Sequence, residues 1–265
     1  MIRPLVLMTV LAGGGAVSAQ ERPWTPLPDP VSATCPGGLC QAQALSSFFE
    51  ALRGSRVVHI LQLGDSHTAG GDITAALLSR LQSRFPGRDI QLDAFGTVGE
   101  TLRGLEIRRP LFDGAVPQLV ILAYGTNDGF DDLLDPAAFE RLLREQIGRV
   151  RREAPEASIL LLGAPEAMRG EGGGTCPDDP HSRWREPATL AVVRDVQHRV
   201  AAEMGVAFWD WKGRMGGNCS AHTLTLGPEP LMRRDHVHFT SAGGDWIGSL
   251  LFDDLMAAHD RRGGR

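Results

Sequence analysis

The stretch "VVHILQLGDSHTAG", residues 57–70, joins an apolar segment to a polar turn. Residues 57–63 are mostly apolar and predict a β-strand, and the residues after the turn begin a helical pattern. Asp65, Ser66 and His67 therefore stand at the carboxyl end of a strand, where open α/β sheets bind their ligands. Two hypotheses follow. Either Ser66 is a nucleophile, or Asp65 and His67 are the metal ligands of a phosphoesterase.

The order of apolar strand and following helix recurs along the chain. Further strands are predicted at residues 90–96, 118–125, 157–163 and 206–211. Helices are predicted at residues 73–85 behind an Asp72 cap, after Asp135-Pro136, at 186–204 before Gly205, and after Thr240. This alternation predicts a parallel sheet with helices on both faces. The segment 118–125 is apolar throughout, as expected of a strand that is buried on both faces.

Length and charge restrict the class of protein further. A chain of 265 residues can bury a full core within one α/β domain. Its formal net charge is −5, and no basic stripe with interleaved aromatic residues occurs. Nucleic-acid binding is therefore not expected.

The first residues have the pattern of a secretory signal peptide. Arg3 precedes a short apolar run at residues 5–12, and the small residues 17–19 offer a cleavage site. The run is shorter than the ~20 residues that a membrane-spanning helix needs, although an uncleaved anchor is the alternative. We predict a signal peptide at residues 1–19 and no membrane span after cleavage. A proline-rich arm at residues 20–41 and one domain at 42–265 would follow.

Four cysteines agree with an exported protein. Cys35 and Cys40 bracket the short loop "CPGGLC", which favours a local disulfide and leaves Cys176 and Cys219 for a second one. Three pairings are possible from the sequence alone. A zinc site is the alternative, but neither pair has the C-x2-C spacing that is typical of such sites.

Short polar segments follow the predicted strands. They are "GDSH" at 64–67, "GTVGET" at 96–101 and "GTND" at 125–128, with "DHVH" at 235–238 just before the last helix. Since the carboxyl ends of parallel strands meet at one edge of a sheet, all four segments could converge there.

With these four segments in this order, the chain resembles the SGNH (GDSL-type) hydrolases. Gly64-Asp65-Ser66 matches the first block of that family, Gly99 the second, Asn127 the third, and Asp235 with His238 the last. The resemblance implies a three-layer α/β/α sandwich with a five-stranded parallel sheet, the flavodoxin-like SGNH fold. It also implies hydrolysis of esters, often acetyl esters. The chain looks most similar to secreted bacterial peptidoglycan O-acetylesterases.

The resemblance assigns a role to each matching residue. Ser66 would be the nucleophile, His238 the base that takes its proton, and Asp235 the carboxylate that orients the imidazole. The oxyanion hole would consist of the backbone N–H groups of Ser66 and Gly99 and the side-chain amide of Asn127. No metal or cofactor is expected.

Several neighbouring residues receive weaker interpretations. Asp65 is expected to organise the turn by hydrogen bonding to the backbone, and His67 either lines the pocket or packs behind it. His236 should point away from His238 if the segment is extended, and Asp128 should anchor a turn. Trp184 lies in the irregular insertion at 166–187 and is a candidate for stacking on a sugar.

The predicted activity is removal of short acyl groups from a carbohydrate or peptidoglycan alcohol by a monomeric, periplasmic or secreted enzyme. An acetyltransferase with the same triad and a lipase- or thioesterase-type hydrolase are alternatives. So is a catalytically inactive cell-wall binding module. A metallophosphoesterase is a further alternative, with Asp65, His67, Asn127, His236 and His238 as metal ligands.

Overall fold

The computed structural model describes residues 35–55, 57–108, 110–174, 176 and 183–263. The predicted signal peptide at 1–19 and the first part of the predicted arm, residues 20–34, lie outside these ranges.

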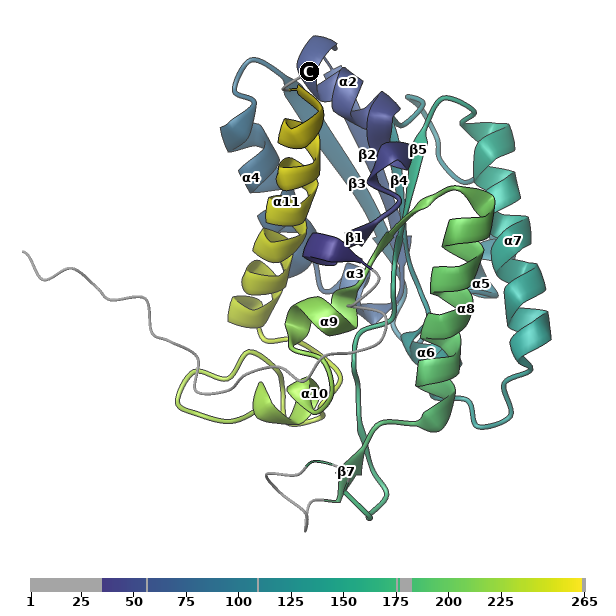
Figure 1. The fold of residues 1–265 in the computed structure, drawn as a ribbon, viewed down its shortest axis with the longest axis vertical. Helices are drawn as coiled ribbons and strands as arrows, with labels where there is room; N and C mark the ends of the chain where they lie inside the picture. Colours follow the sequence, from purple (N-terminus) through teal and green to yellow (C-terminus); the bar gives the residue numbers. More distant parts are fainter. Residues whose placement is uncertain (1–34, 56, 109, 175, 177–182, 264–265) are drawn as a thin grey trace, which may run out of the picture.

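One twisted sheet forms the centre of the molecule (Figure 1). Its five parallel strands lie in the order β3 (Asp89–Gly96), β2 (Val57–Gly64), β4 (Leu119–Ala123), β5 (Ser158–Leu162) and β8 (Ala207–Trp209). The predicted five-stranded parallel sheet is confirmed. A sixth strand, β1 (Leu39–Cys40), pairs antiparallel with β8. Two residues are too few to show a periodic pattern, so the sequence did not predict this strand.

Helices cover both faces of the sheet. One face carries α2 (Ser46–Gly54), α4 (Asp72–Arg84) and α11 (Ser241–Gly263), and the other carries α5 (Gly104–Ile107), α7 (Pro136–Glu153) and α8 (Ala188–Met204) (Figure 1). Shorter helices follow the ends of β2, β4 and β8: α3 (Ser66–Ala69), α6 (Thr126–Gly129) and α9 (Trp211–Met215). Another short helix, α10 (Ser220–Thr223), comes after α9. The remaining elements are η1 (Pro36–Gly38), η2 (Ala42–Leu45), β6 (Arg169–Gly170) and β7 (Trp184–Arg185).

The central strand β4 shows why the fold has three layers. Leu119 and Ile121 belong to the apolar core under α2, α4 and α11, whereas Val120 and Leu122 belong to the core under α7 and α8. Successive side chains of a strand point to opposite faces, so an unbroken apolar run supplies both cores.

Helix ends follow the capping residues of the sequence with one exception. The Asp135 carboxylate accepts a hydrogen bond from the Ala137 backbone N–H, and Gly205 ends α8 in the left-handed conformation. Asp72 was predicted to cap α4, but it is the first residue of the helix, and Gly71 occupies the capping position. Gly71 has a φ of 80°, which glycine adopts without steric cost.

The strand order places the functional edge. β2 lies between β3 and β4, so the chain crosses to opposite sides of β2 in its next two crossovers. Ligands of open α/β sheets bind outside the carboxyl ends of strands at such a reversal. Ser66 lies two residues after the end of β2, where α3 begins.

Both predicted disulfides are present, Cys35–Cys40 and Cys176–Cys219. The first lies beside β1, and the second connects the insertion at 166–187 with the start of α10. Among the described helices, none is long and apolar enough to cross a membrane.

The two disulfides should differ in their contribution to stability. Cys176 and Cys219 are 43 residues apart, whereas Cys35 and Cys40 are 5 apart. Because a cross-link that closes a longer loop removes more entropy from the unfolded chain, replacing Cys176 and Cys219 with serine should cost about 2 kcal/mol more than replacing Cys35 and Cys40. Denaturant unfolding of the two double-serine variants measures the difference. Equal losses would contradict the loop-entropy account.

Candidate active site

A tight turn at the end of β2 positions Ser66. The Asp65 carboxylate accepts a hydrogen bond from the His67 backbone N–H at 3.0 Å and so caps α3. At Gly64, an added Cβ would lie 2.2 Å from Thr68 Oγ1 and 2.7 Å from the Ala123 carbonyl oxygen. Only glycine allows this approach, so Gly64 permits the tight turn that presents Ser66.

Ser66, His238 and Asp235 form a continuous hydrogen-bonded chain. His238 Nε2 lies 3.0 Å from Ser66 Oγ, and His238 Nδ1 lies 2.9 Å from Asp235 Oδ2. Burial alone would raise the pKa of Asp235, but N–H donors from His238 and Val237 hold it below its ordinary value. The ionised carboxylate keeps a proton on Nδ1, which leaves Nε2 able to accept the proton of the serine hydroxyl.

The segment from 235 to 238 is a turn rather than an extended strand. His236 has a φ of 58°, in the left-handed region, and its ring is buried away from Ser66. His236 Nδ1 lies 3.0 Å from the Arg234 carbonyl oxygen, and its Nε2 lies 3.1 Å from His222 Nδ1. The extended conformation, the condition under which His236 was expected to point away from His238, is therefore not met. The sequence offered no signal for the pairing of His236 with His222.

This geometry does not assemble the metal site of the phosphoesterase hypothesis. Both ring nitrogens of His67 bond to protein groups, Nδ1 to Asp65 and Nε2 to the Val237 carbonyl oxygen. Both ring nitrogens of His236 are engaged as well. Neither histidine has a nitrogen that could share a metal with His238.

Hydrogen bonds connect the segment "GTND" at 125–128 with the loop that contains "GTVGET" at 96–101. The Asn127 side-chain amide donates to the Glu100 carbonyl oxygen at 2.8 Å, and the Asp128 carboxylate accepts from the Leu102 backbone N–H at 3.1 Å. Asp128 thus anchors a distant loop as well as its own turn. Gly99 lies in this loop with a φ of 76°, and an added Cβ there would meet nothing within 4 Å. The backbone conformation, not lack of space, is what favours glycine at this position.

A cavity of about 280 Å³ opens beside Ser66. Ser66 and His238 line it together with the apolar side chains of Ile73 and Val98, and Arg233 also lines it. The cavity is at the lower limit of the volumes of ligand pockets, so it suits a small chemical group. Val98 and Arg233 were not predicted, although each lies close in sequence to a recognised motif.

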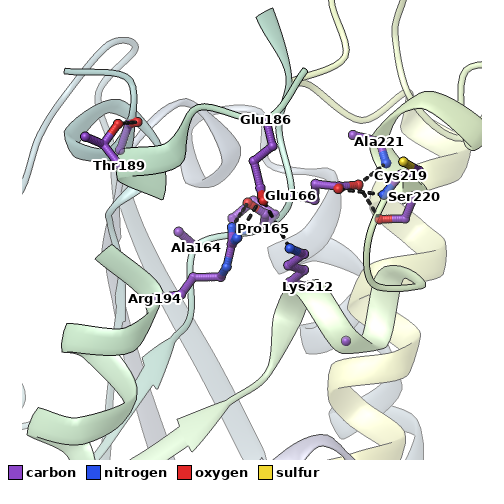
Figure 2. A network of polar contacts seen from close by, with 12 residues as sticks. Ala164, Pro165, Glu166, Glu186, Thr189, Arg194, Lys212, Cys219, Ser220 and Ala221 are labelled. Carbon is purple, nitrogen blue, oxygen red and sulfur yellow. Dashed lines mark hydrogen bonds and ion pairs between the residues drawn. The ribbon is translucent and has the colours of Figure 1, made fainter. Parts of the chain in front are cut away.

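The insertion between β5 and α8 is anchored by a buried carboxylate at its beginning (Figure 2). Glu166 accepts hydrogen bonds from Ser220 Oγ and from the backbone N–H groups of Cys219 and Ala221, at 2.6 to 3.0 Å. Burial, followed by the nearby charge of Glu186, raises the pKa of Glu166. These bonds tie the start of the insertion to α10.

A second carboxylate anchors the end of the insertion (Figure 2). Glu186 pairs with Arg194 of α8 at 2.7 Å and with Lys212 of α9 at 3.1 Å. Both basic side chains are buried, and a buried charge is tolerated only with such a partner. The partners lie 8 and 26 residues away, a spacing that leaves no pattern in the sequence.

Trp184 occupies β7 within this insertion. Its ring stacks on His236 with centroids 3.9 Å apart, and it is not among the residues that line the cavity beside Ser66. The structure therefore places Trp184 against the turn that precedes His238, not against the predicted sugar.

Residues 63–246 match the model of the GDSL-like lipase/acylhydrolase family. The chain belongs to this family. Such membership makes it a carboxylic ester hydrolase, and the match includes the segments that carry Ser66, Gly99, Asn127, Asp235 and His238. No curated protein shows a significant sequence match to the chain.

Solved structures of other esterases share the fold of this GDSL-like hydrolase. A peptidoglycan O-acetylesterase is 20% identical with a TM-score of 0.74, over 84% of this chain and 99% of that one. An acetyl xylan esterase from Geobacillus stearothermophilus is 22% identical with a TM-score of 0.56, over 75% and 94% of the two chains. A two-domain esterase active on acetylated mannans is 16% identical with a TM-score of 0.58, over 84% and 56%. At these identities the likeness shows the fold alone.

Asp128 of this GDSL-like hydrolase should make its stability depend on pH. Burial raises the pKa of Asp128 to about 6, from an ordinary value of 3.8. A carboxyl group with a raised pKa contributes stability that is fully present below the unfolded value and is lost as the pH rises through the folded value. The free energy of unfolding should therefore fall by up to about 3 kcal/mol between about pH 4 and pH 6 on this account.

The variant Asp128→Asn keeps an oxygen acceptor for the Leu102 N–H but cannot titrate. It should therefore lack the part of the fall in unfolding free energy that is due to Asp128. Urea unfolding at several pH values between about 4 and 7 measures it. Asp113→Asn, at an exposed aspartate, is the matched control and should follow the native protein. If the free energy of unfolding of Asp128→Asn fell with pH as steeply as that of the native protein, Asp128 would not titrate in this pH range.

Proposed function

We propose that this hydrolase removes short acyl groups, above all acetyl, from alcohols of a carbohydrate or of peptidoglycan. The observation that supports this most directly is the Ser66–His238–Asp235 chain at the edge of a small cavity. The structural neighbours include a peptidoglycan O-acetylesterase, an acetyl xylan esterase and an esterase active on acetylated mannans, which supports the same class of substrate.

In the proposed reaction, Ser66 Oγ attacks the acyl carbonyl carbon while its proton moves to His238 Nε2. The tetrahedral intermediate collapses, the bond to the alcohol oxygen breaks, and His238 returns its proton to the leaving alcohol. Water then attacks the acyl-enzyme with His238 again as the base, and the acid is released. Transfer to a second alcohol would use the same residues, with an acceptor hydroxyl in place of water.

The oxyanion would be stabilised by the backbone N–H groups of Ser66 and Gly99 and by the Asn127 amide. One amide N–H of Asn127 is held by the Glu100 carbonyl oxygen, and a primary amide has a second N–H to donate. A donor oriented before the reaction costs little reorganisation, and removal of one typically lowers the rate by roughly 10²–10³.

The two disulfides support export, since such bonds persist in oxidising compartments. We place the enzyme in the periplasm or outside the cell, where an envelope polysaccharide would be its substrate.

Replacement of Ser66 tests the proposed mechanism. Ser66→Ala should lower the hydrolysis of nitrophenyl acetate by at least about 10⁴-fold, and an organophosphorus reagent should label Ser66 with one equivalent. Ser79→Ala, at an exposed serine of α4, is the control and should keep full activity. Retained activity in Ser66→Ala, or activity that EDTA abolishes and added metal restores, would refute the serine mechanism.

Arg233 gives a test of the substrate class. Its side chain lines the cavity, and no carboxylate of the described residues forms an ion pair with it. A guanidinium here without a carboxylate partner among the described residues favours an alcohol that carries a negative charge, as the peptide part of peptidoglycan does through its carboxylates. Arg233→Gln should lower kcat/KM about 10-fold for acetate release from O-acetylated peptidoglycan fragments and leave that for acetylated xylooligosaccharides unchanged.

Arg234→Gln is the matched control, because Arg234 is exposed and does not line the cavity. Equal losses on both substrates in Arg233→Gln would contradict recognition of an anionic substrate. A preference of the native enzyme for long-chain nitrophenyl esters over acetyl esters would refute the short acyl group.

A further inference from the structure

The side chain of His67 is buried between two oxygen acceptors. Its Nδ1 lies 3.1 Å from Asp65 Oδ1, and its Nε2 lies 2.9 Å from the Val237 carbonyl oxygen. Only 3% of the His67 side chain and 2% of the Asp65 side chain are exposed. Water is therefore excluded from replacing either contact.

This arrangement determines how many protons the ring needs. A carboxylate and a backbone carbonyl only accept hydrogen bonds, and a neutral imidazole has a single N–H to donate. A neutral His67 would leave one ring lone pair facing an oxygen about 3 Å away in a buried site, which costs the desolvation of an unsatisfied group. A doubly protonated ring satisfies both acceptors.

We propose that His67 is a positioning residue that acts as a permanent imidazolium. It ties the Val237 carbonyl to the Asp65 carboxylate and so holds the next residue, His238, against Ser66. The inference rests on the proposed function for its kinetic consequence, because His238 is the base in that reaction. The protonation of His67 is argued from the two oxygen atoms that its ring nitrogens face, and it does not depend on that reaction.

The surroundings of His67 are consistent with a retained proton. Trp211 of α9 and Phe239 pack around the ring with centroids 5.3 and 6.0 Å away, and neither side chain carries charge. The titratable groups that face it are Asp65, Asp235 and the His238 ring, whose centroid is 5.6 Å away. Burial lowers the pKa of His67, but Asp65, the Val237 carbonyl and Asp235 together raise it above its ordinary value.

A cation at this position also affects the reaction through charge. Like charges repel, so an imidazolium beside His238 favours the neutral form that accepts the Ser66 proton. His67 should therefore keep the enzyme active at lower pH than an uncharged neighbour would. His67 would therefore both position His238 and favour its neutral form.

Nitrogen NMR of the native enzyme tests the protonation directly. At about pH 8.5, where an ordinary histidine is neutral, the ring nitrogens of His67 should both carry protons and show imidazolium chemical shifts. Loss of these signals in His67→Gln assigns them. A neutral ring with one N–H would overturn the proposal, whether the second proton is absent or resides on Asp65.

Kinetics of His67→Gln test the positioning role. Glutamine can still donate to Val237 but carries no charge. We expect kcat to fall by roughly 10²-fold with little change in KM, because a small displacement of the base impairs proton transfer. The pH at which kcat/KM reaches half its plateau should rise by at least about half a unit. The His67 and His238 ring centroids are 5.6 Å apart, and the loss of one charge at that distance has an effect of this size even at the dielectric constant of water.

Two further variants complete the test. Asp65→Asn should lower kcat as His67→Gln does. Because both substitutions remove the same Asp65–His67 interaction, kcat of the double variant should fall by less than the product of the two single fold-losses. His259→Gln is the matched control, because His259 is also buried with Nδ1 on an aspartate, Asp260, but packs against Phe49 and Phe85 away from the site. Its kcat and pH profile should stay native.

The outcomes separate this proposal from the proposed function. An unchanged kcat and pH profile in His67→Gln, with Ser66→Ala inactive, would overturn the role of His67 and leave the esterase mechanism intact. Activity in Ser66→Ala would instead overturn the mechanism, while the NMR result on His67 would still stand or fall by itself.

Discussion

Close approach of neighbouring strand ends at β2 is the constraint on which the site depends. An added Cβ at Gly96, the last residue of β3, would lie 2.2 Å from the Ala69 backbone nitrogen of α3 and 2.7 Å from the Asp65 carbonyl oxygen. An added Cβ at Gly64, the last residue of β2, would likewise lie too close to the Ala123 carbonyl oxygen at the end of β4. Two glycines on adjacent strands thus let the turn that carries Ser66 fit between β3 and β4, where the segments with Gly99 and Asn127 begin.

The parallel strands were predictable because their signal is local. Each is an apolar run ended by glycine or a polar turn, and the order of the motifs identified the family. The strand β1, two residues long, and the left-handed His236 left no such signal. Contacts between distant segments could not be predicted either. Trp184 on His236 and Glu166 on Ser220 depend on how the irregular insertion folds back, which a periodic pattern does not encode.

The contacts of the His67 ring are a clear example of what a sequence motif cannot predict. The sequence places it beside Ser66 but does not say what its ring contacts, so lining the pocket and packing behind it were equally open. The decisive partner is the Val237 carbonyl oxygen, 170 residues away. A backbone carbonyl exists at every position, so no residue type marks it, and only the folded chain shows that both ring nitrogens face acceptors.

The turn that carries His238 illustrates how an open site can be rigid. The side chains of Asp235 and His238 are 46% and 33% exposed, so burial cannot hold them. Hydrogen bonds to the backbone do so instead. His67 donates to Val237, the Met168 N–H of the insertion donates to the His236 carbonyl, and the Arg233 N–H donates to the His238 carbonyl at 2.7 Å. Since a base must be placed before the reaction to be effective, these bonds supply the preorganisation that packing supplies in enclosed sites.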